Sequence, residues 1–333
     1  MVWSWLSKLA PLQLGAYRNL GQRGMLGMNE RNNRYIAEYN PRYLYPLVDN
    51  KLSTKKLALE YGINVPALIG TIENQHDAVN LLDIVKNQTG FCIKPAKGSG
   101  GKGIVVIVKQ QHGQFYKANG QVFGADDLER HISNILAGLF SLAGKSDLVV
   151  IEDLVTVDPC LQAFTYEGVP DLRVILFRGF PVMCMMRLSC RASGGKANLH
   201  QGAVGVGIDM ASGRAIGAIQ DGAPISVHPD TLQPLNTLLV PRWAEMLELA
   251  CGCYDMTGLG YLGVDLVLDK NHGPLLLELN ARPGLSIQMA NNAGLVPRLR
   301  QVAKLTKTDR YSPAERADYS RQQFGDPRPW LLQ

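Results

Sequence analysis

Two apolar runs near the C-terminus, residues 261–268 and 274–280, constrain the fold of this chain more than any other feature. A connection of five residues joins them, so we expect two neighbouring strands. Side chains two residues apart on a strand share a face, which places Glu278 and Asn280 together while the adjacent leucines point into the core. Asp265 stands thirteen residues before Glu278, on the preceding strand. The short connection therefore brings Asp265 beside Glu278 and Asn280.

These three side chains supply two carboxylates and one amide oxygen, the hard oxygen donors that Mg²⁺ prefers. We predict a site for one or two Mg²⁺ ions here, with Mn²⁺ as an alternative. The competing interpretation is that Asp265 and Glu278 are solvated on the outer face of a sheet. The apolar residues around them, 266–268 and 275–277, indicate burial, and buried charges need partners. The metal site is therefore the favoured interpretation.

A second signal is the glycine-rich segment 94–104, which holds four glycines and three lysines within ten residues. Glycines let backbone N–H groups approach phosphates and lysines neutralise the phosphate charge, so we predict a phosphate-binding loop. Strand patterns at 91–95 and 104–108 flank the segment, and a strand after the glycines excludes the dinucleotide-binding motif, which needs a helix there. Ala96 and Gly103 depart from the Walker A pattern. A glycine-rich hairpin turn with solvated lysines is the alternative for this segment taken alone.

A protein-kinase loop fits the glycines better than either of those motifs, because the pattern continues through Gly103-Ile104-Val105 and Lys109 follows. The chain has no H-R-D-x-x-x-x-N and no D-F-G sequence, however. The remaining kinase machinery is thus missing.

Basic and amide side chains lie between the two signals, in residues 171–173, at Arg187 and in residues 196–202. Side chains of this kind, set between a phosphate loop and a metal site, are placed to stabilise the charge of a transferred phosphate. His200 lies among them, and a histidine in such a position is more often structural than a base. The pattern over 171–188 also predicts a hairpin, which turns at residues 178 and 179.

Composition excludes several classes of protein. The chain has 333 residues, 46% hydrophobic and 19% charged, which is typical of a folded protein. The net charge of +5 comes from scattered basic residues, so we expect no nucleic-acid partner. No run of 18 apolar residues predicts a transmembrane helix. The six cysteines include no C-x-x-C pair, and with no secretory signal before them we expect reduced thiols in a cytoplasmic protein.

The first fourteen residues include two tryptophans and four leucines. This segment is either a helix that lies on a membrane surface or partner, or one that packs on its own domain. The second interpretation is favoured.

Taken in order, these features resemble the ATP-grasp superfamily. Within it they are similar to the ribosomal-protein glutamate ligases and to the alpha-L-glutamate ligase-like, sugar-transfer-associated group. The resemblance runs from about Asn40 to Gly294 and rests on the blocks DNKLSTKKLALEYGINVPA, IKPAKGSGGKGI, VVIEDLV, DLRV, KANLHQGAVG, HPDTLQPLNTLLVPRW, LGVDLVL and LLELNARPG, together with the strand that carries Arg187. The order, spacing and number of the blocks make a chance match improbable.

The resemblance implies an α+β fold of the ATP-grasp type, with two α/β sub-domains whose antiparallel sheets grip ATP between them. We expect a short N-terminal arm at 1–48, sub-domain A with the glycine-rich flap at 49–148, and sub-domain B with the metal and phosphate site at 149–300. A helix and tail would follow at 301–333. Most relatives carry a full α/β domain before the ATP-grasp region, whereas fewer than fifty residues precede that region here. A homo-oligomer or a partner chain would then complete the acceptor site.

The resemblance also assigns roles to residues. Lys94 would hold the α and β phosphates, Arg187 would stabilise the transferring phosphoryl group, and Asp171 would lie near the ribose. Asp265, Glu278 and Asn280 would bind magnesium. Arg282 replaces a smaller residue and would bind a substrate carboxylate. The remaining contacts to ATP would come from Lys51, from the flap residues Gly98, Ser99, Gly100, Gly101, Lys102 and Gly103, from the hinge residues Glu152, Asp153 and Leu154, and from Lys196 and Asn198.

The function implied is an ATP-dependent, ADP-forming carboxylate–amine ligase that works through an acyl phosphate. It would add glutamate or another amino acid to a peptide, a protein or a growing oligomer. The alternatives are a kinase-like phosphotransferase and a nucleotide-binding regulatory module.

Overall fold

The largest element of the computed structural model is a sheet of seven strands, ordered β12-β11-β10-β9-β8-β13-β14, in which every neighbouring pair is antiparallel. The structure describes residues 20–98, 100–141, 144–326 and 330. Ser99 and the N-terminal tryptophans lie outside the described residues. The strands are β8 (Asp171–Phe177), β9 (Phe180–Leu188), β10 (Val204–Ile208), β11 (Ala215–Gln220), β12 (Ala223–Pro224), β13 (Tyr261–Asp269) and β14 (Gly273–Asn280).

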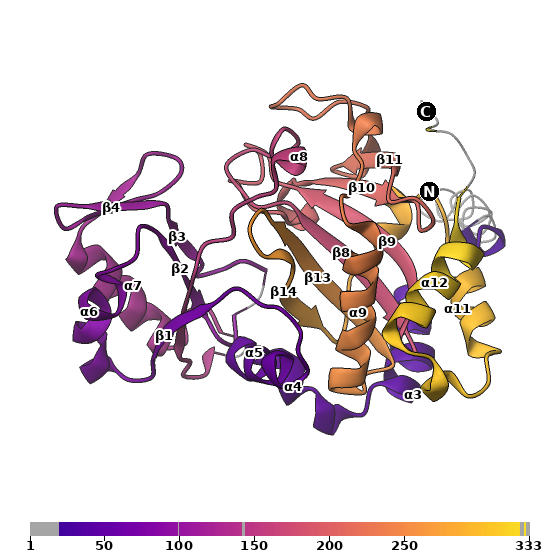
Figure 1. Ribbon diagram of the computed structural model, residues 1–333, viewed down its shortest axis with the longest axis horizontal. Coiled ribbons are helices and arrows are strands. Elements are labelled where there is room, and N and C mark those ends of the chain that lie inside the picture. Colours follow the sequence, from indigo (N-terminus) through magenta and orange to yellow (C-terminus); the bar gives the residue numbers. More distant parts are fainter. Residues whose placement is uncertain (1–19, 99, 142–143, 327–329, 331–333) are drawn as a thin grey trace, which may run out of the picture.

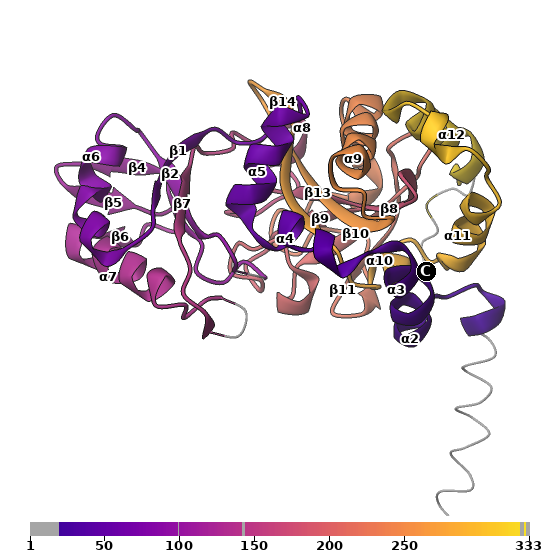
Figure 2. The same ribbon diagram turned by 90° about the horizontal axis from the view of Figure 1, so that it is seen from below.

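Helices cover the large sheet (Figures 1 and 2). On one face α9 (Trp243–Thr257) packs against the central strands and α12 (Pro313–Phe324) packs on α9 and β9. On the other face α10 (Ile287–Ala290) contacts β9, β10 and β11, and α11 (Val296–Ala303) contacts β9. The apolar side chains of the central strands are almost completely buried, so this sheet carries the main core.

The N-terminal region packs on the same face as α10 (Figure 2). It consists of α2 (Met28–Glu30), a π-helix (Arg31–Ile36), α3 (Ala37–Tyr39), a 3₁₀ turn (Arg42–Leu44) and α4 (Pro46–Asp49). The rings of Tyr35 and Tyr39 lie 5.4 and 4.8 Å from the ring of Phe177. Asn40 exchanges hydrogen bonds of 2.7 and 2.8 Å with the backbone of Tyr261, which fixes this arm to β13.

A smaller unit has its own sheet, ordered β1-β7-β2-β3, and its own core (Figure 1). Its strands are β1 (Leu68–Ile72), β7 (Val149–Glu152), β2 (Phe91–Pro95) and β3 (Val105–Ile107), and its helices are a 3₁₀ helix (Gln75–Asn80), α6 (Leu81–Val85) and α7 (Ala125–Leu136). A three-stranded sheet of β4 (Lys109–Gln111), β5 (Gln114–Tyr116) and β6 (Val122–Phe123) extends from it. Two α/β units built on antiparallel sheets confirm the predicted fold class.

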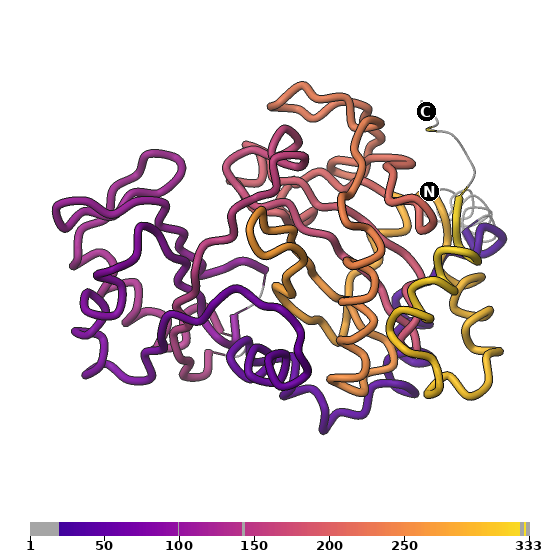
Figure 3. The backbone as a smooth tube through the Cα atoms, viewed as in Figure 1, coloured from indigo at the N-terminus to yellow at the C-terminus, as the bar shows by residue number. Residues whose placement is uncertain are grey.

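Helix α5 (Lys51–Glu60) contacts β14 and α9 of the large unit before the chain enters the small one, and α8 (Pro159–Gln162) follows the return (Figure 3). Strand β7 begins one residue after the boundary expected at 148, yet it pairs with β1 and β2 of the small sheet. The expected division at this residue stays a prediction. Among the described residues no helix is long and apolar enough to cross a membrane.

Candidate functional site

A row of charged residues crosses the face of the large sheet that α10 and the N-terminal arm partly cover. Asp265 pairs in register with Glu278 on β14 and with Arg173 on β8, and Asp171 pairs with Arg187 on β9. Residues directly opposite each other in neighbouring strands point to the same face, as do residues two apart on one strand. All five side chains therefore lie on one face, and the structure brings Asp265 beside Glu278 as the sequence predicted.

Two arginines neutralise the two most buried acids of this row. The guanidinium of Arg187 donates to both carboxylate oxygens of Asp171, at 2.5 and 2.8 Å, and to Asp265 Oδ2 at 2.7 Å. Arg173 binds Asp265 through two nitrogens, one of them 2.6 Å from Oδ2. Asp171 and Asp265 are only 5% and 2% exposed, and buried carboxylates need such partners.

These surroundings shift the acidities of the two aspartates in opposite directions. Burial alone would raise the pKa of Asp265, but Arg173 and Arg187 hold that pKa below its ordinary value, so Asp265 is ionised. Burial raises the pKa of Asp171 above its ordinary value, and the attraction of Arg187 only partly offsets the effect. The two arginines therefore stabilise the ionised form of Asp265 more than burial disfavours it.

Glu278 and Asn280, on the edge strand β14, complete the expected set of oxygen donors at the more exposed end of the charged row. The Glu278 side chain is 37% exposed and meets Lys51 Nζ at 3.3 Å. Asn280 pairs with Gly263 on β13, and its Oδ1 accepts the backbone N–H of Arg282 at 2.8 Å. Among the described residues no cluster of three or more His, Cys, Asp or Glu could hold a metal ion. Two carboxylates and one amide form the candidate set, which suits Mg²⁺.

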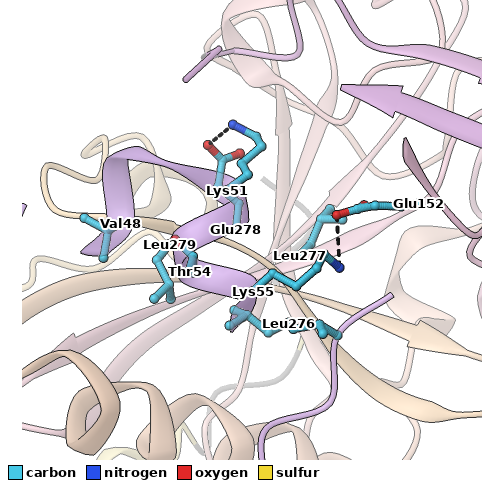
Figure 4. A pocket seen from close by; sticks show the side chains of 10 residues that line it. Val48, Lys51, Thr54, Lys55, Glu152, Leu276, Leu277, Glu278 and Leu279 are labelled. Carbon is cyan, nitrogen blue, oxygen red and sulfur yellow. Dashed lines mark hydrogen bonds and ion pairs between the residues drawn. The ribbon is translucent and has the colours of Figure 1, made fainter. Parts of the chain in front are cut away.

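Lys51 links three parts of the site (Figure 4). It is the first residue of α5, whose N-terminus is capped by the side chain of Asn50. Its Nζ donates to the carbonyl of Gly98 at 2.6 Å in addition to its contact with Glu278, and its backbone N–H donates to Ala96 at 2.8 Å. The glycine-rich loop and the acidic end of β14 are thus held against the same helix.

A second buried charge cluster centres on Glu152 at the end of β7. Lys94 on β2 lies 2.5 Å from one carboxylate oxygen and Lys55 on α5 lies 3.0 Å from the other. Lys55 and Lys51 are four residues apart on α5 and line one pocket with Glu152, Glu278 and Leu277 (Figure 4). The sequence motifs do not identify Lys55. Its spacing of four residues from Lys51, which places both lysines on one side of a helix, is the signal that points to it.

Replacing Glu152 by glutamine is expected to lower the free energy of unfolding by about 3–5 kcal/mol near neutral pH, because Lys55 and Lys94 would stay buried without their carboxylate. Burial alone would raise the pKa of Glu152, but Lys94 and Lys55 lower it below the unfolded value. The ionised carboxylate therefore stabilises the fold fully above the unfolded pKa, and this contribution is lost as the pH falls through the folded pKa.

Urea unfolding of both proteins over a range of pH measures this effect. The difference in the free energy of unfolding between wild type and Glu152→Gln should be constant at roughly pH 6 to 8 and should shrink below about pH 4. Glu248→Gln, on the exposed side of α9, is the matched control with no expected change. A difference that persists unchanged into acid would contradict the ion-pair assignment.

The glycine-rich loop is fixed to the small unit at both ends. The backbone N–H of Lys97 donates to both oxygens of Asp147, at 3.1 and 3.0 Å. At the other end the ring of His131 contacts the carbonyl of Gly103 at 2.9 Å, and a Cβ on Gly103 would collide with Phe140. Gly103 also has a φ of 73°, which glycine adopts without strain.

The middle of the loop meets the large unit. Gln201 Nε2 donates to the carbonyl of Gly100 at 3.0 Å. An ideal Cβ on Gly100 would lie 3.7 Å from Asn198 Nδ2, and one on Gly101 would lie 3.7 Å from Lys196 Cδ. The structure therefore places Lys196 and Asn198 near the loop, while their contact with a nucleotide stays a prediction. Gln201, from the same segment 196–202, bonds to the loop directly. Lys102 is exposed.

Replacing Gln201 by alanine is expected to raise the KM for ATP, the nucleotide that the resemblance implies, by about three- to tenfold with a smaller effect on kcat. One hydrogen bond that holds the loop against the large unit is worth about 0.5–1.5 kcal/mol. Initial rates over a range of ATP concentrations measure both constants. Gln322→Ala, on the exposed side of α12, is the control. An unchanged KM would show that the contact of Gln201 with the loop does not contribute to ATP binding.

The hinge residues and Arg282 lie at the margins of the site. The backbone N–H of Asp153 donates to Ala67 at 2.9 Å and that of Leu154 donates to the side chain of Asp153 at 2.9 Å, so both donors already have partners. Asp153 and Leu154 line a pocket with residues 64–67. Arg282 is exposed and its guanidinium lies over the ring of Tyr45, 5.0 Å from the centroid.

Comparison with known proteins gives a family. The sequence model of the sugar-transfer associated ATP-grasp family matches residues 30–304. No curated protein matches the chain. Similar solved structures include the ATP-grasp ligase PsnB complexed with a minimal precursor, with 14% identity, a TM-score of 0.43 and 80% of this chain covered. The D-cycloserine synthetase DcsG has 14% identity, a TM-score of 0.44 and 80% coverage of this chain and 73% of its own. The D-alanine–D-alanine ligase of Bacillus anthracis has 15% identity, a TM-score of 0.43 and coverages of 83% and 65%.

The chain spans 63% of the length of PsnB, less than two thirds of it. The assignment therefore rests on the family model, which covers most of the chain and confirms the predicted superfamily. This chain belongs to the sugar-transfer associated ATP-grasp family.

Proposed function

We propose that the protein is an ATP-dependent ligase that activates a carboxylate as an acyl phosphate and joins it to an amine, with release of ADP and phosphate. The observation that carries this proposal is the charged row on β8, β9, β13 and β14, which Lys51 connects directly to the glycine-rich loop. The loop proposed to bind phosphate and the acidic residue proposed to bind a cation therefore meet at one lysine.

The residues present fit ATP and a divalent cation. Asp265, Glu278 and Asn280 would hold Mg²⁺, or Mn²⁺ in its place, and both carboxylates lie in one register pair. When bound, the cation would neutralise phosphate charge and orient the phosphates. The half-buried side chain of Leu277, beside Glu152 in the pocket of Figure 4, offers an apolar surface for a base.

The side chains of the protein would act mainly by positioning and charge stabilisation, as is usual in phosphoryl transfer. Lys94 and Lys196 would bind phosphate oxygens while the glycines of the loop let its backbone N–H groups approach them. Arg187, held by Asp171, would stabilise the charge that develops on the transferred phosphoryl group. The bond between the γ phosphorus and the bridging oxygen breaks, a bond to the carboxylate oxygen forms, and the amine then displaces phosphate.

The substrates we propose are an amino acid, with glutamate favoured, and the amine or carboxylate of a peptide, a protein or a growing oligomer. The exposed guanidinium of Arg282, two residues beyond Asn280, supports a carboxylate-bearing substrate. A second subunit that completes the acceptor site stays a prediction.

A screen of the twenty amino acids for ATP-dependent phosphate release, with the products weighed by mass spectrometry, tests the proposal. We expect ADP release that needs an added amino acid and a product heavier by an amide-linked residue. ADP release without any amine, and a phosphorylated product, would favour a kinase-like phosphotransferase. No ADP release with any substrate would favour a regulatory module.

A further inference from the structure

The charges on this face of the large sheet are balanced by its own side chains and by Lys51. Both oxygens of Asp265, the most buried of the expected cation ligands, are occupied by guanidinium groups. Among the described residues, the ion pairs of this face join three carboxylates of the sheet to two arginines of the sheet and one lysine of α5: Asp171, Asp265, Glu278, Arg173, Arg187 and Lys51. A divalent cation that approaches Asp265 in the free protein therefore meets two fixed positive charges.

If a cation bound Asp265, the two arginines would lose different shares of their hydrogen bonds. Arg187 has two further hydrogen bonds to Asp171 and keeps them if Asp265 turns to another partner. Within the described residues, every hydrogen bond of the Arg173 guanidinium goes to Asp265. The Arg173 side chain is only 11% exposed, so it cannot exchange Asp265 for bulk water at low cost. Arg173 needs a new anionic partner when Asp265 is taken.

We propose that Arg173 occupies, in the free protein, the charge position that the divalent cation takes in the nucleotide complex, and that the phosphates of the nucleotide are its partner after the exchange. This inference rests on the ATP and cation site proposed above. The cation takes Asp265 from Arg173 and so leaves Arg173 without an anionic partner, which the phosphates of the nucleotide then supply. The cation and the nucleotide therefore bind cooperatively. Arg173 is a charge-compensating residue whose removal makes the cation site accessible without nucleotide.

Titration of the full-length protein with Mn²⁺, followed by the electron paramagnetic resonance signal of free Mn²⁺, tests the proposal without any turnover. The Mn²⁺ that a non-hydrolysable ATP analogue binds by itself is measured in a titration without protein and subtracted. For wild type we expect weak binding of Mn²⁺ alone, and binding to the protein stronger by about tenfold or more when the analogue is present. Arg173→Met removes the charge and keeps an apolar side chain of similar length. It should bind Mn²⁺ alone about tenfold or more tightly than wild type, and the analogue should add less.

The control is Arg191→Met, because Arg191 is an exposed arginine 3.9 Å from Asp230 and lies outside the charged row. It should titrate as wild type does. If Arg173→Met does not fold, judged by circular dichroism, Arg173→Gln supplies the test. It removes the charge and keeps a polar side chain that can still donate a hydrogen bond to Asp265, and it should bind Mn²⁺ alone more tightly than wild type.

Binding of Mn²⁺ alone that is no tighter in the Arg173 variants than in wild type would overturn the proposal, and so would the absence of Mn²⁺ binding in all proteins with the analogue present. The titration contains neither carboxylate substrate nor amine. A protein that behaves as expected here but never releases ADP would therefore contradict the ligase proposal and leave the role of Arg173 standing.

Discussion

Replacing Arg187 by methionine is expected to lower kcat by about 10²–10³-fold, the usual cost of losing one donor that stabilises charge in the transition state. Arg187 is the only described side chain that bridges Asp171 and Asp265, and its guanidinium is fixed by three hydrogen bonds of 2.5 to 2.8 Å. A fixed donor stabilises developing charge without the cost of reorganisation. Phosphate release at saturating ATP and substrate measures the effect.

Stability has to be measured in the same experiment. Removing Arg187 leaves Asp171 buried without its partner, so the Arg187→Met variant should also unfold at lower urea concentration. Rates must therefore be divided by the folded fraction. Arg187→Lys keeps the charge but not the bidentate contact with Asp171. Compared with Arg187→Met, it should recover part of the free energy of unfolding and little of kcat. A folded Arg187→Met protein with a near-normal kcat would show that Arg187 has only a structural role.

Replacing Glu278 by glutamine is expected to lower kcat by about 10²-fold or more and to raise the Mg²⁺ concentration needed for half-maximal rate, because several kcal/mol of charge stabilisation depend on the cation. This substitution is cleaner than one at Asp265. Glu278 is 37% exposed and its one charged partner among the described residues is Lys51, so the fold should be retained. Rates measured over a range of Mg²⁺ concentrations separate the two effects.

Glu248→Gln provides the matched control, since it makes the same chemical change at an exposed position of α9. It should have the kcat and Mg²⁺ dependence of wild type. If Glu278→Gln keeps both as well, Glu278 is not a cation ligand and only neutralises Lys51.

Local patterns predicted the strands well. The hairpin expected over 171–188 is present as β8 and β9, and its turn residues Arg178 and Gly179 both have positive φ, 50° and 84°. Two consecutive residues of positive φ match the twist of a tight hairpin. The pairing of β13 with β14 also agrees with the sequence, but plain alternation from the turn would place Asp265 opposite Leu277. A β-bulge beside Asp265, with Leu277 as the extra residue of β14, places Asp265 opposite Glu278 instead.

The partners of Asp265 could not be predicted, because they depend on strand order. Strand β8 neighbours β13 although more than eighty residues separate Arg173 from Asp265. Alternation along each strand shows which side chains share a face but not which strands are adjacent. The double ion pair of Glu152 with Lys55 and Lys94 was missed for the same reason, since three separate elements contribute to it.

The end of helix α7 depends on a tertiary contact. Helix α7 ends at Leu136, because Gly138 adopts a φ of 83° and an ideal Cβ at this position would lie 2.4 Å from the carbonyl of Lys145. A left-handed glycine just after a helix is a common ending. The close approach of residue 145 that requires it is a tertiary contact, which the spacing of apolar residues does not show.

Transfer of oxygen from carboxylate to phosphate tests acyl-phosphate chemistry most directly. The protein is incubated with ATP, Mg²⁺ and a mixture of the amino acids that carry ¹⁸O in their carboxylates, and the mass of the released phosphate is measured by mass spectrometry. We predict phosphate that carries one ¹⁸O atom, because the carboxylate oxygen that attacks the γ phosphorus leaves with it when the amine displaces phosphate. ADP formation accompanied by phosphate without ¹⁸O would contradict activation of the carboxylate by phosphorylation.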